Sequence, residues 1–147
     1  MIIDTKKILD PNGKEFFRYI AFCYTTGQNN REDHIELEQQ LGKLLRSKAP
    51  NIAIGLENVD NLIGPTKNII VKAQKHAIKL IKTYHVITNS TSTMYEEMET
   101  LFKERTGKGA FARITETSKV KDFVYIHKGY SSFERTVEDY FKNKETR

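Results

Sequence analysis

The sequence predicts an α/β fold, in which a single mixed, mostly parallel sheet carries flanking helices and an N-terminal β-hairpin. A turn motif separates two strand-like segments at the start of the chain. Strand-like and helix-like segments then alternate from Phe16 onward, which is the order of parallel strands joined by crossover helices. The 147 residues suit one full core, and no linker composition interrupts them, so we expect a single domain over residues 1–147.

The hairpin is expected to turn at Asp10-Pro-Asn-Gly-Lys14. Proline presets one dihedral angle of such a turn, and the Asn-Gly pair reaches positive φ at little cost. The return strand, residues 15–25, is rich in aromatic and β-branched side chains. This strand is too apolar for an exposed edge, so we expect it inside the sheet.

The first helix is expected after residues 26–30, where Asn29 or Asn30 can cap it. Glu32 and Asp33 suit the positive end of its dipole, and Ala49-Pro50 ends it. One side of this helix is apolar and carries His34, Leu37, Leu41, Leu44 and Leu45. The apolar run 51–56 that follows has the length of a buried strand.

Gly64-Pro65 opens the second helix, because proline is tolerated at the first helical position. Its expected apolar face consists of Ile70, Ala73, Ala77, Leu80 and Ile81. Residues 84–89 then form another predicted strand.

The last part of the chain is expected to add a helix, a strand and a terminal helix. Residues 90–93 with Glu96 make a capping box for a helix with Met94 and Met98 in its apolar stripe. Residues 110–117 fit either a strand or a helix, so the secondary structure of 107–120 stays open. Residues 121–127 are typical of a strand, and Ser131 with Glu134 caps the terminal helix.

Composition narrows the class of protein. Apolar residues make up 38% of the chain and charged residues 29%, which argues against disorder. We find no apolar run long enough to cross a bilayer and no signal peptide, so we expect a cytoplasmic protein. Cys23 is the single cysteine, which excludes an internal disulfide. A net charge of +5 permits an anionic partner without requiring one.

No catalytic, phosphate-binding or metal-binding motif is apparent in the sequence. The four histidines, His34, His76, His85 and His127, match no metalloprotease or hydrolase spacing. The Gly107-Lys-Gly109 triplet is better explained as a helix stop than as a phosphate cradle. We therefore predict a protein that is not an enzyme and has no metal site and no cofactor.

The second helix carries an ordered set of cations. Lys72, Lys75, Lys79 and Lys82 are expected opposite its apolar stripe, where they could contact the phosphates of a nucleic acid. A solvated helix face is the simpler explanation, since no aromatic platform or base-reading motif accompanies these lysines.

The segment Ile52-Ala-Ile-Gly-Leu-Glu-Asn-Val-Asp-Asn-Leu-Ile-Gly-Pro-Thr-Lys-Asn-Ile-Ile-Val-Lys72 resembles the central part of STAS domains, the anti-sigma factor antagonist fold, and of their SpoIIAA-like relatives. In that family an apolar strand ends in a polar loop that leads into a helix whose N-terminus faces partners. The resemblance covers residues 16–142 through pattern rather than through invariant residues. It implies partner contacts at Asn58, Asp60, Asn61, Gly64, Thr66, Asn89 and Ser90.

The chain departs from this family at the phosphorylated serine. Where classical members have Asp-Ser-Ser-Gly before the helix, this chain has Ile63-Gly64-Pro65-Thr66. Thr66, one position later, is therefore the candidate phosphorylation site, because the first turn of a helix stabilises an added phosphate.

Three functions follow as hypotheses. The first is a regulatory or signalling domain that binds a protein through the loop and helix after the strand 52–56. The second is a small nucleic-acid-binding domain that uses Lys72 to Lys82. The third is a carrier of an apolar ligand such as a lipid, with the aromatic strand 16–24 as the pocket wall. Neither the partner's identity nor the oligomeric state follows from the sequence.

Overall fold

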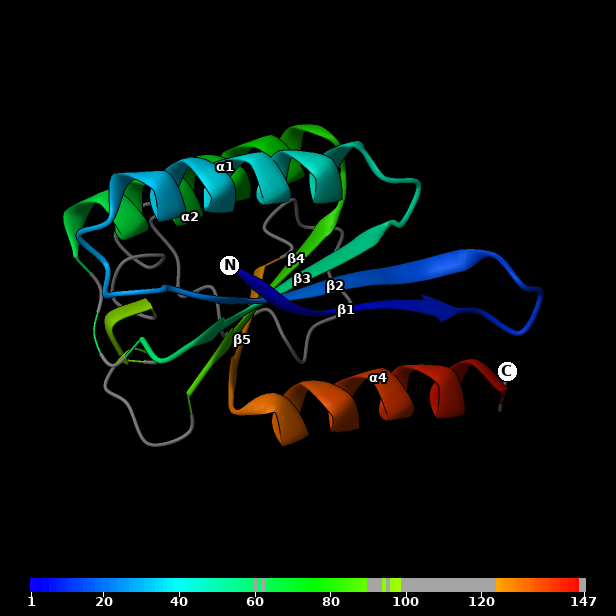
Figure 1. The fold of residues 1–147 in the computed structure, drawn as a ribbon. Helices are drawn as coiled ribbons and strands as arrows, with labels where there is room; N and C mark the ends of the chain where they lie inside the picture. The colour runs from blue at the N-terminus through cyan, green and yellow to red at the C-terminus, as the bar shows by residue number, and fades with distance from the viewer. Residues whose placement is uncertain (60, 62, 90–93, 95, 99–123, 146–147) are drawn as a thin grey trace.

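The computed structural model describes residues 1–59, 61, 63–89, 94, 96–98 and 124–145, which form a mixed five-stranded sheet with helices on both faces (Figure 1). The strands are β1 (Ile2–Leu9), β2 (Glu15–Cys23), β3 (Asn51–Glu57), β4 (Thr83–Thr88) and β5 (Val124–Lys128). The helices are α1 (Arg31–Arg46), α2 (Gly64–Lys79) and α4 (Tyr130–Glu145). The strands lie in the order β1-β2-β3-β4-β5; β1 is antiparallel to β2, and all other pairs are parallel. The predicted fold class is thereby confirmed.

The N-terminal hairpin forms at the predicted turn. The Asp10 carboxylate accepts hydrogen bonds from the backbone N–H groups of Asn12 and Lys14, and Gly13 has a φ of 83°. β1 is the exposed edge strand, whereas β2 pairs with β1 on one side and with β3 on the other. The apolar return strand is therefore inside the sheet, as predicted.

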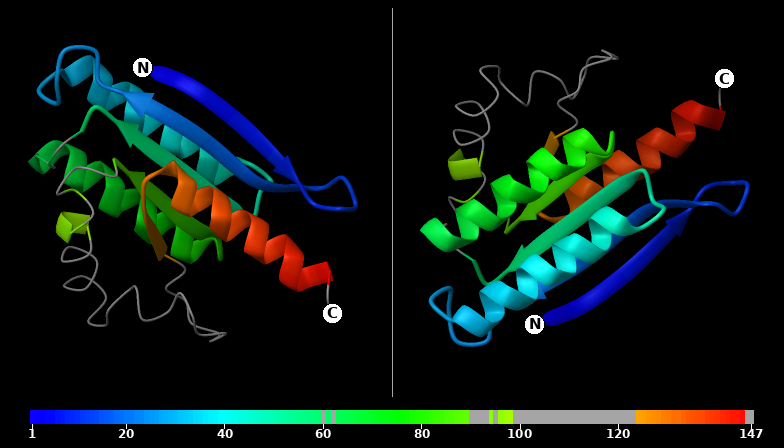
Figure 2. Two further views of the ribbon diagram at one scale, coloured as in Figure 1. Left: turned by 90° about the horizontal axis from the view of Figure 1, so that it is seen from below. Right: turned by 90° about the horizontal axis from the view of Figure 1, so that it is seen from above.

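The two faces of the sheet have separate cores (Figure 2). α1 and α2 lie side by side on one face, and α4 crosses the other. Alternation along β2 divides its aromatic residues between them. Phe22, with Tyr24 just after the strand, belongs to the core under α1 and α2, whereas Phe17 and Tyr19 belong to the core under α4.

Helix α1 begins and ends with side-chain caps. Asn30, one of the two predicted caps, accepts hydrogen bonds from the N–H groups of Glu32 and Asp33. At the other end the Ser47 hydroxyl donates to the carbonyl of Leu44, which ends the helix at Arg46, before Ala49-Pro50.

Helix α2 ends earlier than its apolar pattern predicted. The helix stops at Lys79, and Leu80 and Ile81 are 52% and 76% exposed, so their expected place on the buried face was wrong. The cause is a backbone motif, in which the N–H of Ile81 donates to the Ile78 carbonyl and the N–H of Lys82 to the Ala77 carbonyl. These bonds reverse the chain before another buried turn can form.

The later elements agree with the sequence where they are described. Met94 and Met98 are fully buried in the core under α1 and α2. β5 and α4 occupy the predicted positions, whereas residues 107–120 lie outside the described residues. None of the described helices combines the length and apolar composition needed to span a membrane.

Candidate functional site

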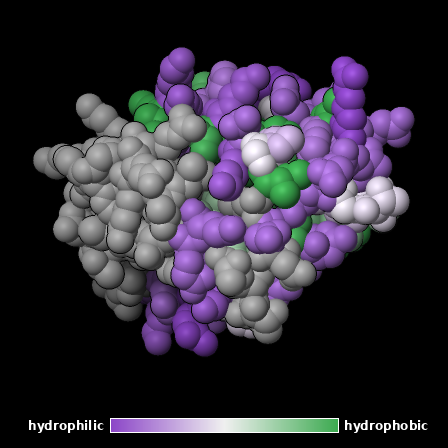
Figure 3. Space-filling view, turned by 90° about the vertical axis from the view of Figure 1, so that its left-hand side faces the viewer, coloured by the Kyte–Doolittle hydropathy of each residue, from purple (hydrophilic) through white to green (hydrophobic). Residues whose placement is uncertain are grey.

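The carboxyl ends of the parallel strands meet at one edge of the sheet, where the sequence predicted partner contacts. Cys23 of β2 lies opposite Glu57 of β3, and Thr88 of β4 lies opposite Lys128 of β5. The loop 24–30 leaves this edge toward α1, and the loop that follows β3 leaves it toward α2. In the view of this edge in Figure 3, hydrophilic side chains predominate among the described residues.

Asn58 fastens these two loops together. Its side-chain carbonyl accepts a hydrogen bond from the backbone N–H of Tyr24 at 3.2 Å, and its amide donates to the Tyr24 carbonyl at 3.0 Å. The residue has a φ of 50°, a conformation that asparagine tolerates better than most side chains. The side-chain amide thus continues the β2–β3 pairing by one step, although the residue itself is exposed.

Gln28 makes a second connection between the loops. Its amide donates to the Asn61 carbonyl at 2.6 Å, and its side-chain carbonyl accepts from the N–H of Ile63 at 3.3 Å. The N–H of Ile63 precedes α2, which has no side-chain cap of its own. Gln28 therefore fixes the entry of the chain into α2 from the neighbouring loop.

A buried carboxylate anchors the loop 24–30 to α1. Asp33 is buried and accepts hydrogen bonds from the N–H and the hydroxyl of Thr25 at 2.9 and 2.8 Å. Burial opposes ionisation, but these hydrogen bonds, together with the N-terminal ammonium group 3.9 Å away, outweigh it and lower the pKa of Asp33. The loop is consequently held by a charged acceptor as well as by Gln28 and Asn58.

Thr66, the candidate phosphorylation site, is fully buried. Its hydroxyl lies 2.8 Å from the hydroxyl of Tyr24, whose pKa is raised by burial. A kinase would reach Thr66 only after the first turn of α2 moved away from the sheet. Gly64, in contrast, is exposed, and a side chain there would meet no other atom within 4 Å.

The remaining predicted contact residues differ in exposure. Asn61 is exposed and Asn89 is half-buried at the end of β4, whereas Asp60 and Ser90 lie outside the described residues. The exposed side chains at the ends of the two loops and on the first turns of α2 form what we call the corner surface: Thr26, Asn29, Asn61, Pro65 and Asn68. None of these five side chains is charged, although Glu57 at the end of β3 and Arg31 at the start of α1 are exposed beside them.

A small hollow of about 210 Å³ opens at the same edge on the α4 side of the sheet. Tyr19, Glu57, Thr88 and Tyr130 line it, together with Gly55. A Cβ atom at Gly55 would lie 3.0 Å from the Tyr19 hydroxyl, so glycine leaves room for the tyrosine ring. Burial raises the pKa of Tyr19, which keeps its hydroxyl protonated.

Of the four lysines predicted to form one exposed row on α2, three are exposed and one is buried. Lys72, Lys75 and Lys79 are exposed on the helix. Lys82 lies beyond the helix end, is 9% exposed, and donates through Nζ to the carbonyls of Ser47 and Ala49. Its predicted membership of a solvated basic face was therefore wrong, because its ammonium group binds carbonyls after the end of α1.

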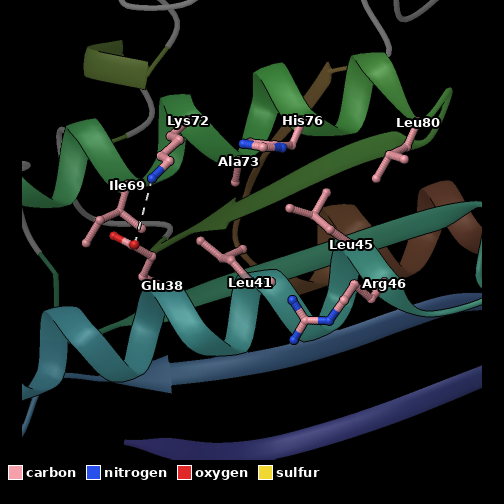
Figure 4. A pocket seen from close by; sticks show the side chains of 10 residues that line it. Glu38, Leu41, Leu45, Arg46, Ile69, Lys72, Ala73, His76 and Leu80 are labelled. Atoms are coloured by element: carbon pink, nitrogen blue, oxygen red, sulfur yellow. Dashed lines mark ion pairs between the residues drawn. The ribbon is translucent and has the colours of Figure 1, made fainter.

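Sequence reasoning missed a groove between α1 and α2, whose lining side chains Figure 4 shows. Its volume is about 300 Å³, and its apolar wall includes Leu41, Leu45 and Ile69. Lys72 and Glu38 bridge the two helices with Nζ and Oε1 3.9 Å apart. The small residues Gly42 and Ala73 were the available signal, but a groove needs two helices in contact, which one sequence pattern does not specify.

The sequence analysis also did not predict that two of the four histidines, His85 and His127, pair in the core. Nδ1 of His85 and Nε2 of His127 are 2.9 Å apart under α4, with Phe133 in edge contact with both rings. Burial lowers the pKa of His127 to about 4 and that of His85 well below its ordinary value, so both rings are neutral at pH 7. In the described part of the chain, no three metal-ligating side chains come together in a way that could hold a metal ion.

A scan against protein-family models finds no match to this chain, and searches of curated proteins and of solved structures find no significant similarity. Of the expectations drawn from the STAS resemblance, the structure supports the mixed five-stranded sheet with an N-terminal hairpin and flanking helices.

Proposed function

We propose that this chain is a STAS-like regulatory domain, that it is not an enzyme, and that it binds a protein partner through the corner surface. The observation that carries the proposal is the double connection between the loops. Asn58 and Gln28 each make two hydrogen bonds from one loop to the backbone of the other.

Such connections favour binding because they remove the need to order the loops when a partner arrives. An interface loses affinity for each flexible segment that it must fix, and loops already held in place avoid that loss. Asn58 would act by holding this conformation, whereas exposed side chains such as Asn61 and Asn68 would make direct contacts. The amide and hydroxyl groups of the corner surface suit a partner that recognises them by hydrogen bonds.

The proposal is tested by capture from the native cell with a matched pair of variants. Asn61→Arg combined with Asn68→Arg places two bulky charges on the corner surface without removing the hydrogen bonds of Gln28 or Asn58. Asn12→Arg makes the same type of change at the exposed hairpin turn, at the opposite end of β2. We expect a protein that is retained by the unchanged chain and by Asn12→Arg but lost with the corner variant.

The captured protein must then bind the purified chain with the same dependence on the two variants. A set of bound proteins that is identical for all three chains would contradict the proposal. Catalytic turnover of a substrate in the hollow beside Tyr19, lost on Tyr19→Phe, would overturn its non-enzymatic part.

A further inference from the structure

The C-terminal end of α2 contains a backbone conformation that its residue does not favour. Lys82 and Ile81 make the two hydrogen bonds of a Schellman motif to Ala77 and Ile78, which puts Ile81 at the position that usually holds glycine. Ile81 has a φ of 56°. For a β-branched residue this is an outlier, disfavoured by roughly tenfold in population relative to an ordinary backbone conformation.

Packing within the chain does not compensate for this strain. The Ile81 side chain is 76% exposed, and the adjacent Leu80 is 52% exposed. Two large aliphatic side chains therefore project next to each other from one turn. Strain of this kind, held at an exposed position, points to a role outside the fold itself.

The residues around this turn are rich in cations and come from parts of the sequence without acidic residues. Residues 39–56 and 61–95 contain no Asp or Glu. Lys75 and Lys79 are exposed on the last turns of α2, and Arg46 lines the groove with Leu80. Lys48 lies in the loop whose carbonyls bind the Lys82 ammonium group, so this loop adjoins the end of α2. We call this region, formed by Arg46, Lys48, Lys75, Lys79, Leu80 and Ile81, the basic end.

Three carboxylates of the described residues, those of Glu15, Glu38 and Asp10, are already engaged elsewhere. Glu15 pairs with Arg18, and Glu38 pairs with Lys72 at the far part of the groove. Asp10 accepts hydrogen bonds from its own turn. Among the described residues, no ion pair joins a carboxylate to Arg46, Lys48, Lys75 or Lys79, so their charges are available to an anionic partner.

We propose that the basic end is a docking surface for an anionic lipid bilayer, with Leu80 and Ile81 entering the headgroup region and the surrounding cations contacting lipid phosphates. Charge complementarity selects the anionic partner, and the paired aliphatic side chains select a bilayer over a nucleic acid. A phosphate backbone would use the same lysines, but it gains nothing from an exposed leucine and isoleucine. This surface lies at the opposite edge of the sheet from the corner surface, so it is independent of the proposed protein contact (Figure 1).

The test is a binding titration of the full chain with vesicles of equal parts phosphatidylcholine and phosphatidylglycerol. Neutral phosphatidylcholine vesicles provide the reference, and rising salt is expected to weaken binding to the anionic vesicles. Lys75→Glu combined with Lys79→Glu is expected to weaken that binding at least twentyfold, since each basic residue at an anionic membrane contributes about a fivefold gain. Arg135→Glu combined with Lys142→Glu makes the same change in net charge on exposed residues of α4 and is expected to have little effect.

Ile81→Gly tests the apolar contribution without the risk of unfolding, because glycine is the residue that this backbone conformation favours. We expect vesicle affinity to fall roughly tenfold, as for the loss of one partly inserted aliphatic side chain, while thermal stability rises. Leu80→Ala is expected to weaken binding as well. Its matched control is Ile35→Ala, because Ile35 is 48% exposed on α1.

Three outcomes would overturn the proposal. The unchanged chain could bind anionic and neutral vesicles equally, or it could bind neither. The third is vesicle affinity that is unchanged by Ile81→Gly. If a labelled mixed-sequence RNA or DNA oligonucleotide instead binds tightly, with loss on the α2 charge reversals and none on Ile81→Gly, the basic end is a nucleic-acid surface.

Discussion

Asn58 and Ile81 have nearly the same unusual backbone angle, with φ of 50° and 56°, at opposite edges of the sheet. At Asn58 the side chain makes two hydrogen bonds to the backbone of Tyr24. At Ile81 the side chain is mostly in solvent. One strained position thus has a structural explanation within the chain, and the other does not.

The comparison distinguishes a surface residue that stabilises the fold, Asn58, from one whose side chain is available to a partner, Ile81. The side chain of Asn58, predicted as a contact residue, is used internally. Ile81, predicted as a core residue, is exposed. Each edge also has one buried charge. The carboxylate of Asp33 is buried near the corner surface, and the ammonium-bearing side chain of Lys82 is buried beside the basic end.

As pH falls, protonation of His127 should destabilise the fold first, and protonation of Asp33 should do so only at lower pH. The pKa of His127 is lowered by burial from 6.5 to about 4, so the unfolded chain takes up this proton at a higher pH than the folded chain. The free energy of unfolding is therefore unaffected by this histidine above pH 6.5 and falls by about 3 kcal/mol as pH is lowered toward 4. The pKa of Asp33 is lowered, so its contribution is lost only at still lower pH, below the ordinary aspartate value.

Urea unfolding measured in steps from pH 7 to pH 4 checks this order. Asp33→Asn should leave the decline between pH 6.5 and 4 in place. His127→Gln should reduce it, and His85→Gln combined with His127→Gln should flatten it, because burial lowers the pKa of both histidines. A decline in that range that disappears with Asp33→Asn would show that the corner, and not the histidine pair, sets the acid limit.

Lys82→Met should cost about 2 kcal/mol of unfolding free energy. Methionine preserves the apolar stem but removes the charged donor from the carbonyls of Ser47 and Ala49, and hydrogen bonds to charged groups are worth roughly 1.5–3 kcal/mol. Chemical denaturation measures the loss. Lys79→Met is the control, and as an exposed change it should stay within about 0.5 kcal/mol. Equal effects of the two variants would mean that Lys82 is not a structural cation.

The ion pair across the groove should contribute least. Glu38 and Lys72 are 58% and 64% exposed with a separation of 3.9 Å, so their coupling should be below about 0.5 kcal/mol. A double-mutant cycle with Glu38→Gln and Lys72→Met gives this coupling. A value well above 1 kcal/mol would indicate that the pair holds α1 and α2 together.

Much of the fold could be predicted from local sequence patterns. The turn at Asp10–Lys14, the cap at Asn30 and the proline at the start of α2 are local signals, and the structure contains all three. The end of α2 was missed because the apolar pattern continues through Leu80 and Ile81. A reader of the sequence expects glycine where the Schellman motif forms, and isoleucine gives no such signal.

The site was less predictable, because its interactions join residues distant in the sequence. The bonds of Gln28 to Asn61 and of Asn58 to Tyr24 span 33 and 34 positions, and His85 meets His127 across 42. Polar side chains such as these have no periodic pattern that reveals their partners. The strand order brings them together, and it becomes known only with the fold.

The central claim is that strain is compensated within the chain at Asn58 and left uncompensated at Ile81. Parallel denaturation of Asn58→Gly and Ile81→Gly tests it most directly, since glycine relieves the backbone at both positions and removes the side chain. We predict opposite signs: a loss of about 1–2 kcal/mol for Asn58→Gly, from its two hydrogen bonds, and a gain of about 1 kcal/mol for Ile81→Gly. A change of the same sign at both positions would contradict the account.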